Sequence, residues 1–279
     1  MQNHDVSHWN EGWEYLDNVA LENKNALHNM LNSSYYIGIQ NFLEKKFGSL
    51  EGINTVELGC GRGVASAALA TQGANVTLVD LSDAALTSAK EFYANNGLNT
   101  PNCNQADVFN LPSNLEGKFD VVSSFGLVEH FEGEERLEVF KSHVKILRAG
   151  GCAVILVPNR QYLPGQFYKF ISERLGTWPY GFERDFTPRE LLKIGQLAGL
   201  TDCKIIGSEV LYDLYSHTVL KLPGFLKQIT RQRIRGPVTA KYDKSGKYTM
   251  TTHSKKSLLK SPLDAQFGFM LVLLGQNSN

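Results

Sequence analysis

The stretch that decides the fold is Thr55-Val56-Glu57-Leu58-Gly59-Cys60-Gly61-Arg62-Gly63. An apolar strand over 53–58 runs into three glycines spaced two apart, and a helix of small residues is expected at 64–70. Glycine has no Cβ, so its backbone can press directly against a ligand. The helix points free backbone N–H groups at the turn. A second apolar strand at 76–79 ends in Asp80, where a carboxylate can bind the two hydroxyls of a ribose. The pattern predicts a nucleoside-binding unit.

The glycine spacing indicates which nucleoside is bound. The dinucleotide fingerprint requires G-x-G-x-x-G, whereas Val64 follows Gly63 here and the spacing is G-x-G-x-G. Glu57 lies two residues before the first glycine, and a carboxylate there repels phosphates but suits an ammonium group. An NAD(P)-dependent oxidoreductase is therefore the less favoured alternative.

Several motifs along the chain are similar to those of one enzyme family. The glycine stretch closely resembles the first motif of the class I S-adenosylmethionine-dependent methyltransferases, and the match continues to about residue 158 and resumes at the C-terminus. The segment 126–131, GLVEHF, resembles that of small-molecule methyltransferases of the ubiquinone-biosynthesis type. The resemblance implies a doubly wound, Rossmann-like α/β fold with a seven-stranded, mostly parallel sheet. It also implies EC 2.1.1 activity with S-adenosyl-L-methionine as cofactor.

The resemblance also implies roles for single residues. The three glycines would wrap the methionine part of the cofactor, with Glu57 reaching its amino group through neighbouring groups or water. Asp80 would hold the ribose, and Asp107 the adenine amino group. From the residues alone, Asp107 could equally cap the segment 108–115. Cys60 could be a small packing residue inside the loop. The predicted cofactor-binding residues are Glu57, Gly59, Cys60, Gly61, Gly63, Asp80, Leu81, Asp107, Val108 and Phe125.

His130 is the candidate catalytic residue. It follows the predicted fourth strand, 119–125. A hydroxyl acceptor needs a general base, and an unperturbed histidine titrates near neutrality, which suits that task. A helix-capping or structural histidine beside Glu129 is the alternative. No metal site is predicted, because Glu129 and His130 alone do not make a ligand set.

Aromatic residues gather in two segments that we expect to act as lids. The segment 162–186 holds eight aromatic residues in 25, before a helix opened by the capping box at 187–190. Related enzymes carry substrate-binding insertions at this point, and its prolines and glycines suggest short helices joined by turns. A second cluster lies within 7–15. Core packing is the alternative for both. The predicted substrate residues are Trp9, Trp13, Tyr162, Phe167, Tyr168, Trp178 and Tyr180.

The charge distribution is uneven although the net charge is zero. The stretch 221–260 holds eleven lysines and arginines against one acid, Asp243. Such a stretch can attract a phosphorylated substrate, a carrier protein, RNA or an anionic lipid surface, or it can simply stay solvated. Few aromatic residues accompany it, so a nucleic-acid partner is not expected. A methyltransferase acting on RNA or on a carrier-bound or lipid substrate, and a catalytically silent cofactor-binding scaffold, remain as alternatives.

The chain is expected to divide into four parts. These are an N-terminal helical lid at 1–50, a cofactor-binding α/β half at 51–158, an aromatic substrate-lid insertion at 159–187, and a C-terminal part of the sheet at 188–279. The last part contains predicted strands at 202–211 and 267–274, separated by a basic insertion at 212–266.

Composition favours a cytoplasmic enzyme. Four scattered cysteines without a CxxC pair predict reduced thiols. No apolar run approaches the ~20 residues that a membrane span requires, and residues 1–10 lack a signal-peptide pattern. The sequence therefore predicts methyl transfer to an oxygen or nitrogen atom, less readily to carbon, of a small biosynthetic molecule.

Overall fold

The computed structural model describes residues 25–178, 180–208, 266 and 269–278, together with the backbone of 240–242 and 248–250. Trp9 and Trp13 lie outside the described residues, as does nearly all of the basic stretch 221–260. Among the described residues, no helix is long and apolar enough to cross a membrane.

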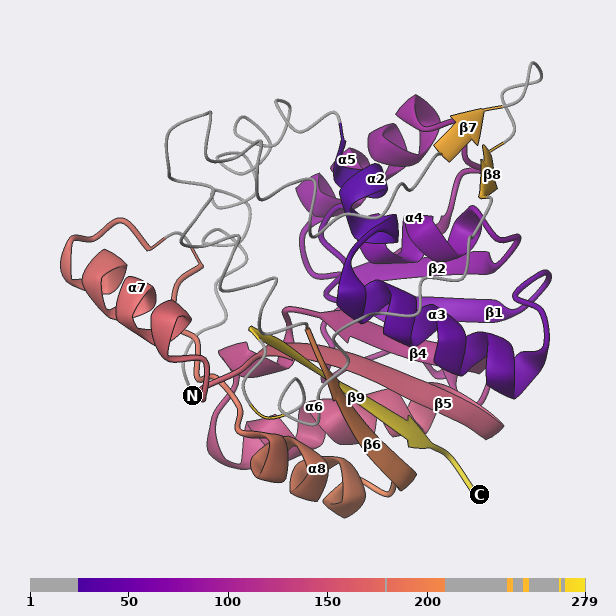
Figure 1. Cartoon of the computed structure of the whole chain (residues 1–279). Helices are drawn as coiled ribbons and strands as arrows, with labels where there is room; N and C mark the ends of the chain where they lie inside the picture. The colour runs from indigo at the N-terminus through magenta and orange to yellow at the C-terminus, as the bar shows by residue number, and fades with distance from the viewer. Residues whose placement is uncertain are drawn as a thin grey trace, which may run out of the picture.

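Seven strands form one sheet in the order β3-β2-β1-β4-β5-β9-β6 (Figure 1). Neighbouring strands are parallel except around β9, which runs antiparallel to both β5 and β6. This is the predicted Rossmann-like methyltransferase sheet. The strands are β1 (Asn54–Leu58), β2 (Asn75–Asp80), β3 (Asn102–Gln105), β4 (Phe119–Phe125), β5 (Leu147–Pro158), β6 (Thr201–Gly207) and β9 (Met270–Gln276).

Two predicted strands differ from the structure in their bounds. β6 ends at Gly207, short of the predicted end at 211, and β9 begins at Met270, after the predicted start at 267. Residues 209–211 and 267–268 lie outside the described residues. A further pair, β7 (Ala240–Tyr242) and β8 (Tyr248–Met250), forms a separate two-stranded antiparallel sheet.

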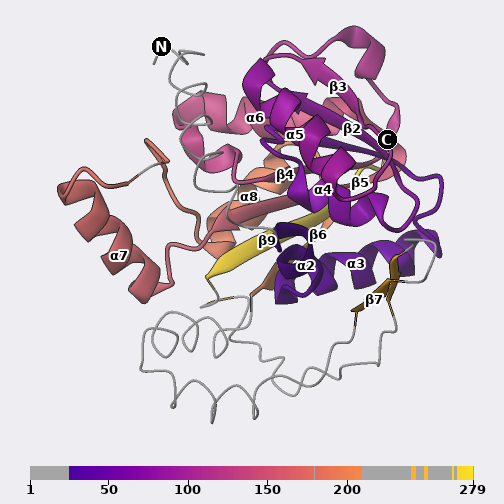
Figure 2. The same ribbon diagram turned by 90° about the horizontal axis from the view of Figure 1, so that it is seen from above.

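Helices cover both faces of the sheet (Figures 1 and 2). Successive side chains of a strand point to opposite faces. Val154 and Leu156 of β5 therefore pack in one core cluster, and Ala153 and Ile155 in the other. The first cluster includes α2 (Ala26–Leu31), α3 (Ser34–Phe47), α4 (Val64–Ala70) and α5 (Asp83–Asn95); the second includes α6 (Gly133–Ile146) and α8 (Pro188–Leu197).

The segment after β5 forms one helix, α7 (Leu163–Arg174), where short helices joined by turns were predicted. The prediction was wrong because Pro164 falls in the first helical turn, where the missing N–H has no intrahelical partner in any case. Gly176 and Gly181 come after the end of the helix. In both views α7 stands away from the sheet (Figures 1 and 2).

Two short 3-10 helices complete the part of the chain that the structure describes. η1 (Ser113–Leu115) precedes β4, and η2 (Val128–His130) follows it. η2 lies beyond the carboxyl end of β4, and β4 is the neighbour of β1 in the sheet. The strand order reverses between β1 and β4, and open α/β sheets bind their ligands at such a point. The topology therefore directs attention to the residues that follow these strands.

Candidate functional site

The glycine turn between β1 and α4 has the left-handed backbone that glycine tolerates. Gly59 has φ of 59° and Gly63 of 63°. A Cβ at Gly59 would lie 2.6 Å from Leu127 Cδ1, and one at Gly63 would lie 2.9 Å from Leu78 Cδ1. Both distances are shorter than carbon contacts allow, so the turn requires glycine for its shape and for its packing.

Asp80, the last residue of β2, holds this turn in place. Its Oδ2 accepts a hydrogen bond from the Gly61 N–H at 2.9 Å, and its Oδ1 accepts one from the Ser82 N–H at 2.9 Å. The residue is only 9% exposed. Burial raises the pKa of the Asp80 carboxyl, while the backbone donors oppose that shift by stabilising the charged form. The carboxylate is thereby fixed beside the turn.

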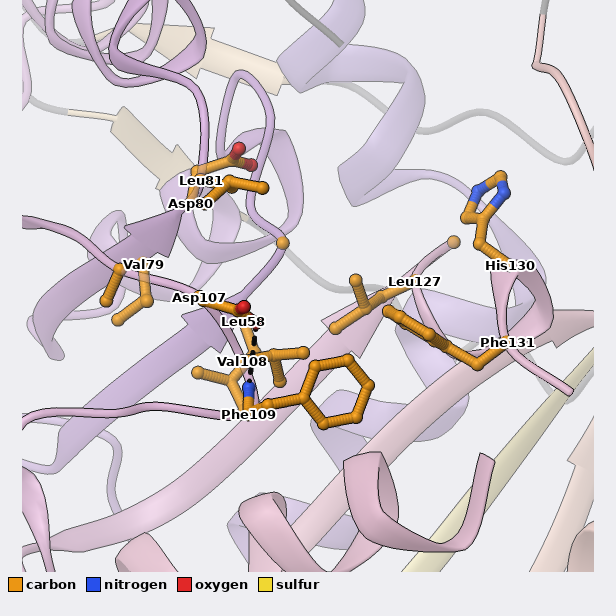
Figure 3. A pocket seen from close by; sticks show the side chains of 13 residues that line it. Leu58, Val79, Asp80, Leu81, Asp107, Val108, Phe109, Leu127, His130 and Phe131 are labelled. Atoms are coloured by element: carbon orange, nitrogen blue, oxygen red, sulfur yellow. Dashed lines mark hydrogen bonds between the residues drawn. The ribbon is translucent and has the colours of Figure 1, made fainter. Parts of the chain in front are cut away.

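A pocket opens where β1, β2 and β4 end (Figure 3). Figure 3 shows Asp80 and Asp107 on one side and His130 on the other, with Leu127 between them. The arrangement places carboxylates at one end of an otherwise apolar pocket and an imidazole at the other. Its lining consists of Leu58, Gly59, Val79, Asp80, Leu81, Ala106, Asp107, Val108, Phe109, Gly126, Leu127, His130 and Phe131.

Asp107 combines a local turn with a place in the pocket. Its Oδ1 accepts a hydrogen bond from the Phe109 N–H at 2.9 Å, drawn as a dashed line in Figure 3. This is the kind of local cap that the sequence left open. The same residue lines the pocket between Ala106 and Val108. The capping interpretation and the ligand-binding interpretation are therefore compatible.

Glu57 lies beneath the turn and does not line the pocket. Its Oε2 accepts hydrogen bonds from the Ser66 N–H, at 3.1 Å, and from the Ser66 hydroxyl. Burial raises the pKa of the Glu57 carboxyl to about 7, the two Ser66 donors oppose this, and nearby Asp80 adds to it. Glu57 thus ties β1 to α4.

Four other predicted cofactor residues also lie outside the pocket lining: Cys60, Gly61, Gly63 and Phe125. Cys60 is buried, and burial raises the pKa of its thiol well above the ordinary value. Such a thiol is unreactive and fits the packing interpretation of the sequence.

His130 ends η2 and lines the pocket. Its Nδ1 lies 2.8 Å from the backbone carbonyl oxygen of Phe182, which fixes the ring. Beside it, burial raises the pKa of Glu129 to about 8. The backbone carbonyl of Glu129 accepts a hydrogen bond from the Arg184 N–H at 2.8 Å. These contacts join the segment after β4 to the segment after α7.

The fold adds Glu183 to this place, which sequence reasoning missed. One carboxylate oxygen of Glu129, one of Glu183 and one ring nitrogen of His130 lie within 4.8 Å of one another. Burial raises the pKa of Glu183 to about 7, although Lys169 opposes the shift. No spacing in the sequence links residues so far apart, so only the folded chain reveals the group.

The predicted aromatic lid residues lie outside the pocket lining. Tyr162 is buried, and its ring packs edge-on against Phe269 with centroids 5.4 Å apart. Trp178 contacts Tyr168 and Tyr180 edge-on, at 6.2 and 5.2 Å between centroids. Phe167, by contrast, is 69% exposed on α7.

This sheet order, glycine turn and pocket define the class of Rossmann-like cofactor-dependent methyltransferases. The sequence model of a family described as "Methyltransferase domain" matches residues 56–151. A ubiquinone biosynthesis O-methyltransferase of Haemophilus ducreyi is 30% identical over 172 residues, covering 59% of this chain and 71% of the relative. The enzyme of the same name from Nitrosomonas europaea is 27% identical over 173 residues, covering 60% and 72%.

Solved structures share the fold across most of the chain. A Thermotoga maritima S-adenosylmethionine-dependent methyltransferase, described as a possible histamine N-methyltransferase, has a TM-score of 0.57 at 15% identity and covers 98% of this chain and 100% of its own. The magnesium protoporphyrin IX methyltransferase of Synechocystis PCC 6803 has a TM-score of 0.52 at 16% identity, covering 88% and 82%.

The chain belongs to the class I S-adenosylmethionine-dependent methyltransferases. It is an enzyme of class EC 2.1.1 and takes its methyl group from S-adenosyl-L-methionine. This membership rules against the NAD(P)-dependent oxidoreductase and the catalytically silent scaffold that the sequence left open.

Proposed function

We propose that the enzyme methylates an oxygen or nitrogen atom of a small molecule, with the cofactor bound in the pocket of Figure 3. The observation that carries the proposal is the pocket itself, which has Asp80 and Asp107 at one end and His130 at the other. When bound, the cofactor supplies an electrophilic methyl group on a sulfonium. The remaining requirement is to align an acceptor with that methyl and to exclude water.

The described residues fit the adenosyl part of the cofactor. Asp80 offers carboxylate oxygens to the two ribose hydroxyls, as an acid at the end of the second strand does in related folds. Leu81 and Val108 give apolar walls for the adenine, and Asp107 can accept from its amino group. Gly59 allows the backbone to approach closely.

The methionine part would lie along the glycine turn, over Gly61 and Gly63. Glu57 would act on the cofactor's amino group only indirectly, because its carboxyl oxygen is bound to Ser66. Cys60 and Phe125 would then pack behind the turn and beneath the pocket floor.

His130 is the proposed base for a hydroxyl acceptor. When its Nδ1 carries the proton, it donates to the Phe182 carbonyl, and the other ring nitrogen can accept the acceptor's proton. An amine acceptor needs only to be neutral. The relatives named ubiquinone biosynthesis O-methyltransferase favour oxygen as the acceptor atom.

The segment 159–187 would close over the acceptor as a lid. Support comes from its position directly after β5 and from the Phe182 carbonyl, which already touches His130. Tyr168, Trp178 and Tyr180 form the aromatic group of this segment, and Tyr162 and Phe167 flank it at the base and on the outside.

The experiment is mass spectrometry of S-adenosylhomocysteine formation with panels of phenols, alcohols, amines and carboxylic acids. At least one hydroxyl or amine compound should be methylated. His130→Gln should slow turnover on a hydroxyl acceptor by about 100-fold or more, the usual contribution of a positioned base, and leave cofactor affinity unchanged. His28→Gln, an exposed histidine on α2, is the matched control. Full activity of His130→Gln on a hydroxyl acceptor would exclude the base role.

A further inference from the structure

Leu127 lies across the pocket, between its two polar ends. Figure 3 shows its side chain between the carboxylates of Asp80 and Asp107 and the imidazole of His130. It belongs to the short connection from β4 to η2. Leu127 is not among the residues that the sequence predicted to bind cofactor or substrate, although in the proposed function it stands where the two would meet.

The Leu127 side chain packs on the bare face of Gly59. A Cβ built on that glycine would lie 2.6 Å from Leu127 Cδ1, 3.2 Å from its Cγ and 3.3 Å from its Cβ. Three atoms of one side chain therefore surround the position where the glycine lacks a Cβ. The same missing Cβ is what lets the backbone of Gly59 approach a cofactor. Leu127 and a bound cofactor thus share the space over this glycine.

The backbone around Leu127 is held on both sides. The Gly126 N–H donates a hydrogen bond to the Leu156 carbonyl of β5 at 3.1 Å, and the His130 N–H donates one to the Leu127 carbonyl at 3.2 Å. The next residue, Val128, is fully buried. The point from which the Leu127 side chain starts is therefore fixed, and only rotation about its own side-chain bonds can move it.

The neighbouring apolar walls of the pocket are firmly packed. The rings of Phe109 and Phe131 meet edge to face, with centroids 5.2 Å apart. Phe131 and Val108 are buried in the core cluster on this side of the sheet. Closely packed interiors yield little to an added group. The half-buried Leu127 is therefore the lining residue best placed to determine how much room remains between the two polar ends.

We propose that Leu127 determines which alkyl group the enzyme accepts on the sulfonium, by limiting the space between Gly59 and His130. The inference rests on the proposed function and makes it more specific, because it names the side chain that restricts the cofactor to one carrying a methyl group. A methyl group fits beside Leu127, whereas an ethyl group needs room for one more methylene. The restricted space also keeps the methyl group aligned with the acceptor.

Packing explains why a single methylene matters at this place. An ethyl group would have to displace Leu127 or push the sulfonium out of position. Inserting a methylene into a well-packed site forces side chains away from their preferred rotamers. In apolar pockets one methylene changes binding by about 10- to 200-fold. Truncating Leu127 to alanine would make room for the larger group and remove the discrimination.

The test compares S-adenosyl-L-methionine with its S-ethyl analogue, S-adenosyl-L-ethionine, by calorimetric titration of the full-length protein without an acceptor. Wild type should bind the methyl compound about 10-fold or more tightly than the ethyl compound. Leu127→Ala should bring the ratio of the two dissociation constants close to one. A ratio measured on one protein cancels any general loss of affinity. Leu197→Ala, at an exposed leucine on α8, is the matched control and should keep the wild-type ratio.

Titration with S-adenosylhomocysteine separates this inference from the function on which it rests, because that compound carries no alkyl group to be transferred. Wild type and both variants should bind it, which also shows that they are folded. The same methyl-to-ethyl ratio in Leu127→Ala as in wild type would overturn the role of Leu127 and leave the methyltransferase proposal intact. A wild type that binds the methyl and ethyl compounds equally would do the same. A wild type that binds none of the three compounds would overturn the proposed function and this inference with it.

Discussion

Asp80 connects the second strand to the glycine turn, because its carboxylate oxygens accept hydrogen bonds from the backbone N–H groups of Gly61 and Ser82. The same carboxylate lines the pocket. One residue therefore shapes the turn and offers charge to a ligand, and the effects of replacing it on folding and on binding must be measured separately.

Asp80→Asn should weaken the binding of S-adenosylmethionine by about 1.5–3 kcal/mol, the usual value of hydrogen bonds to a charged group. The amide keeps the shape of the side chain but loses its charge and one acceptor. Calorimetric titration measures the affinity, and thermal unfolding reports on the fold. Asp83→Asn, an exposed acid in the first turn of α5, should bind as the wild type does. Equal affinity of Asp80→Asn and wild type would exclude the ribose role.

His143 is a buried histidine that makes the free energy of unfolding depend on pH. It lies buried in α6, with Nδ1 2.7 Å from the Val139 carbonyl and Nε2 2.9 Å from the Ser124 hydroxyl. Burial lowers the pKa of His143 to about 4, from an ordinary value of 6.5. Below pH 6.5 the unfolded chain takes up a proton that the folded chain binds only near pH 4. This residue therefore makes the free energy of unfolding fall as the pH drops from 6.5 to 4.

His143→Gln should remove that part of the pH dependence, about 3 kcal/mol between pH 6.5 and 4 by the linkage of 1.36 kcal/mol per pKa unit. Urea unfolding at several pH values measures it as the difference from wild type. Taking the difference cancels the opposite contributions of buried carboxyls such as Glu57. A variant with the same slope as wild type would show that His143 is protonated in the folded chain at an ordinary pH.

At the level of elements, the connection from β1 to α4 requires glycine at position 59 for two reasons, its left-handed backbone and its close packing. Gly59 and Gly97 have similar left-handed φ angles, 59° and 68°. A Cβ at Gly59 would collide with Leu127, whereas nothing lies within 4 Å of a Cβ at Gly97. The two positions therefore separate backbone strain from crowding.

Gly59→Ala and Gly97→Ala should both lose about 1–2 kcal/mol of stability from the left-handed backbone alone. Gly59→Ala should lose more, because Leu127 must move, and its affinity for S-adenosylhomocysteine should fall as the pocket wall shifts. Urea unfolding and calorimetry measure the two effects. Equal losses in both variants, with unchanged affinity, would show that the turn does not depend on close packing.

The strands and helices also show which parts of the structure could be predicted from the sequence. The strand–glycine–helix–strand unit was correct because local patterns determine it. Val56 and Leu58 of β1 point into the same core, and Asp80 follows an apolar run. α7 was mistaken for several helices because Pro164 and Gly165 read as breakers, although both fall in its first turn. Glu183 could not be found, because its meeting with Glu129 depends on how the segment after α7 returns to η2.

At the level of the whole molecule, the pocket and the aromatic group belong to different parts of the chain. The pocket is built from turns after the first four strands, whereas the aromatic group around Trp178 belongs to the segment after β5. In the proposed arrangement the first part binds the cofactor, and the second encloses the acceptor.

Trp178→Leu should therefore raise the KM for the acceptor by about 10-fold or more, by loss of an apolar and aromatic contact worth 1–3 kcal/mol. The Kd for S-adenosylmethionine should not change. Steady-state kinetics with a methylated compound from the panel and calorimetry measure the two quantities. Phe170→Leu, also on the lid segment, is the matched control, because Phe170 contacts Arg174 and not the Trp178 group. A change in cofactor affinity without a change in KM would contradict this division of roles.

The most direct measurement is a crystal structure of the protein with bound S-adenosylhomocysteine. We expect the adenosyl group between Asp80 and Asp107, with both ribose hydroxyls donating to the Asp80 carboxylate and the sulfur directed toward His130. An adenosyl group bound elsewhere, or a ribose that does not touch Asp80, would contradict the proposal.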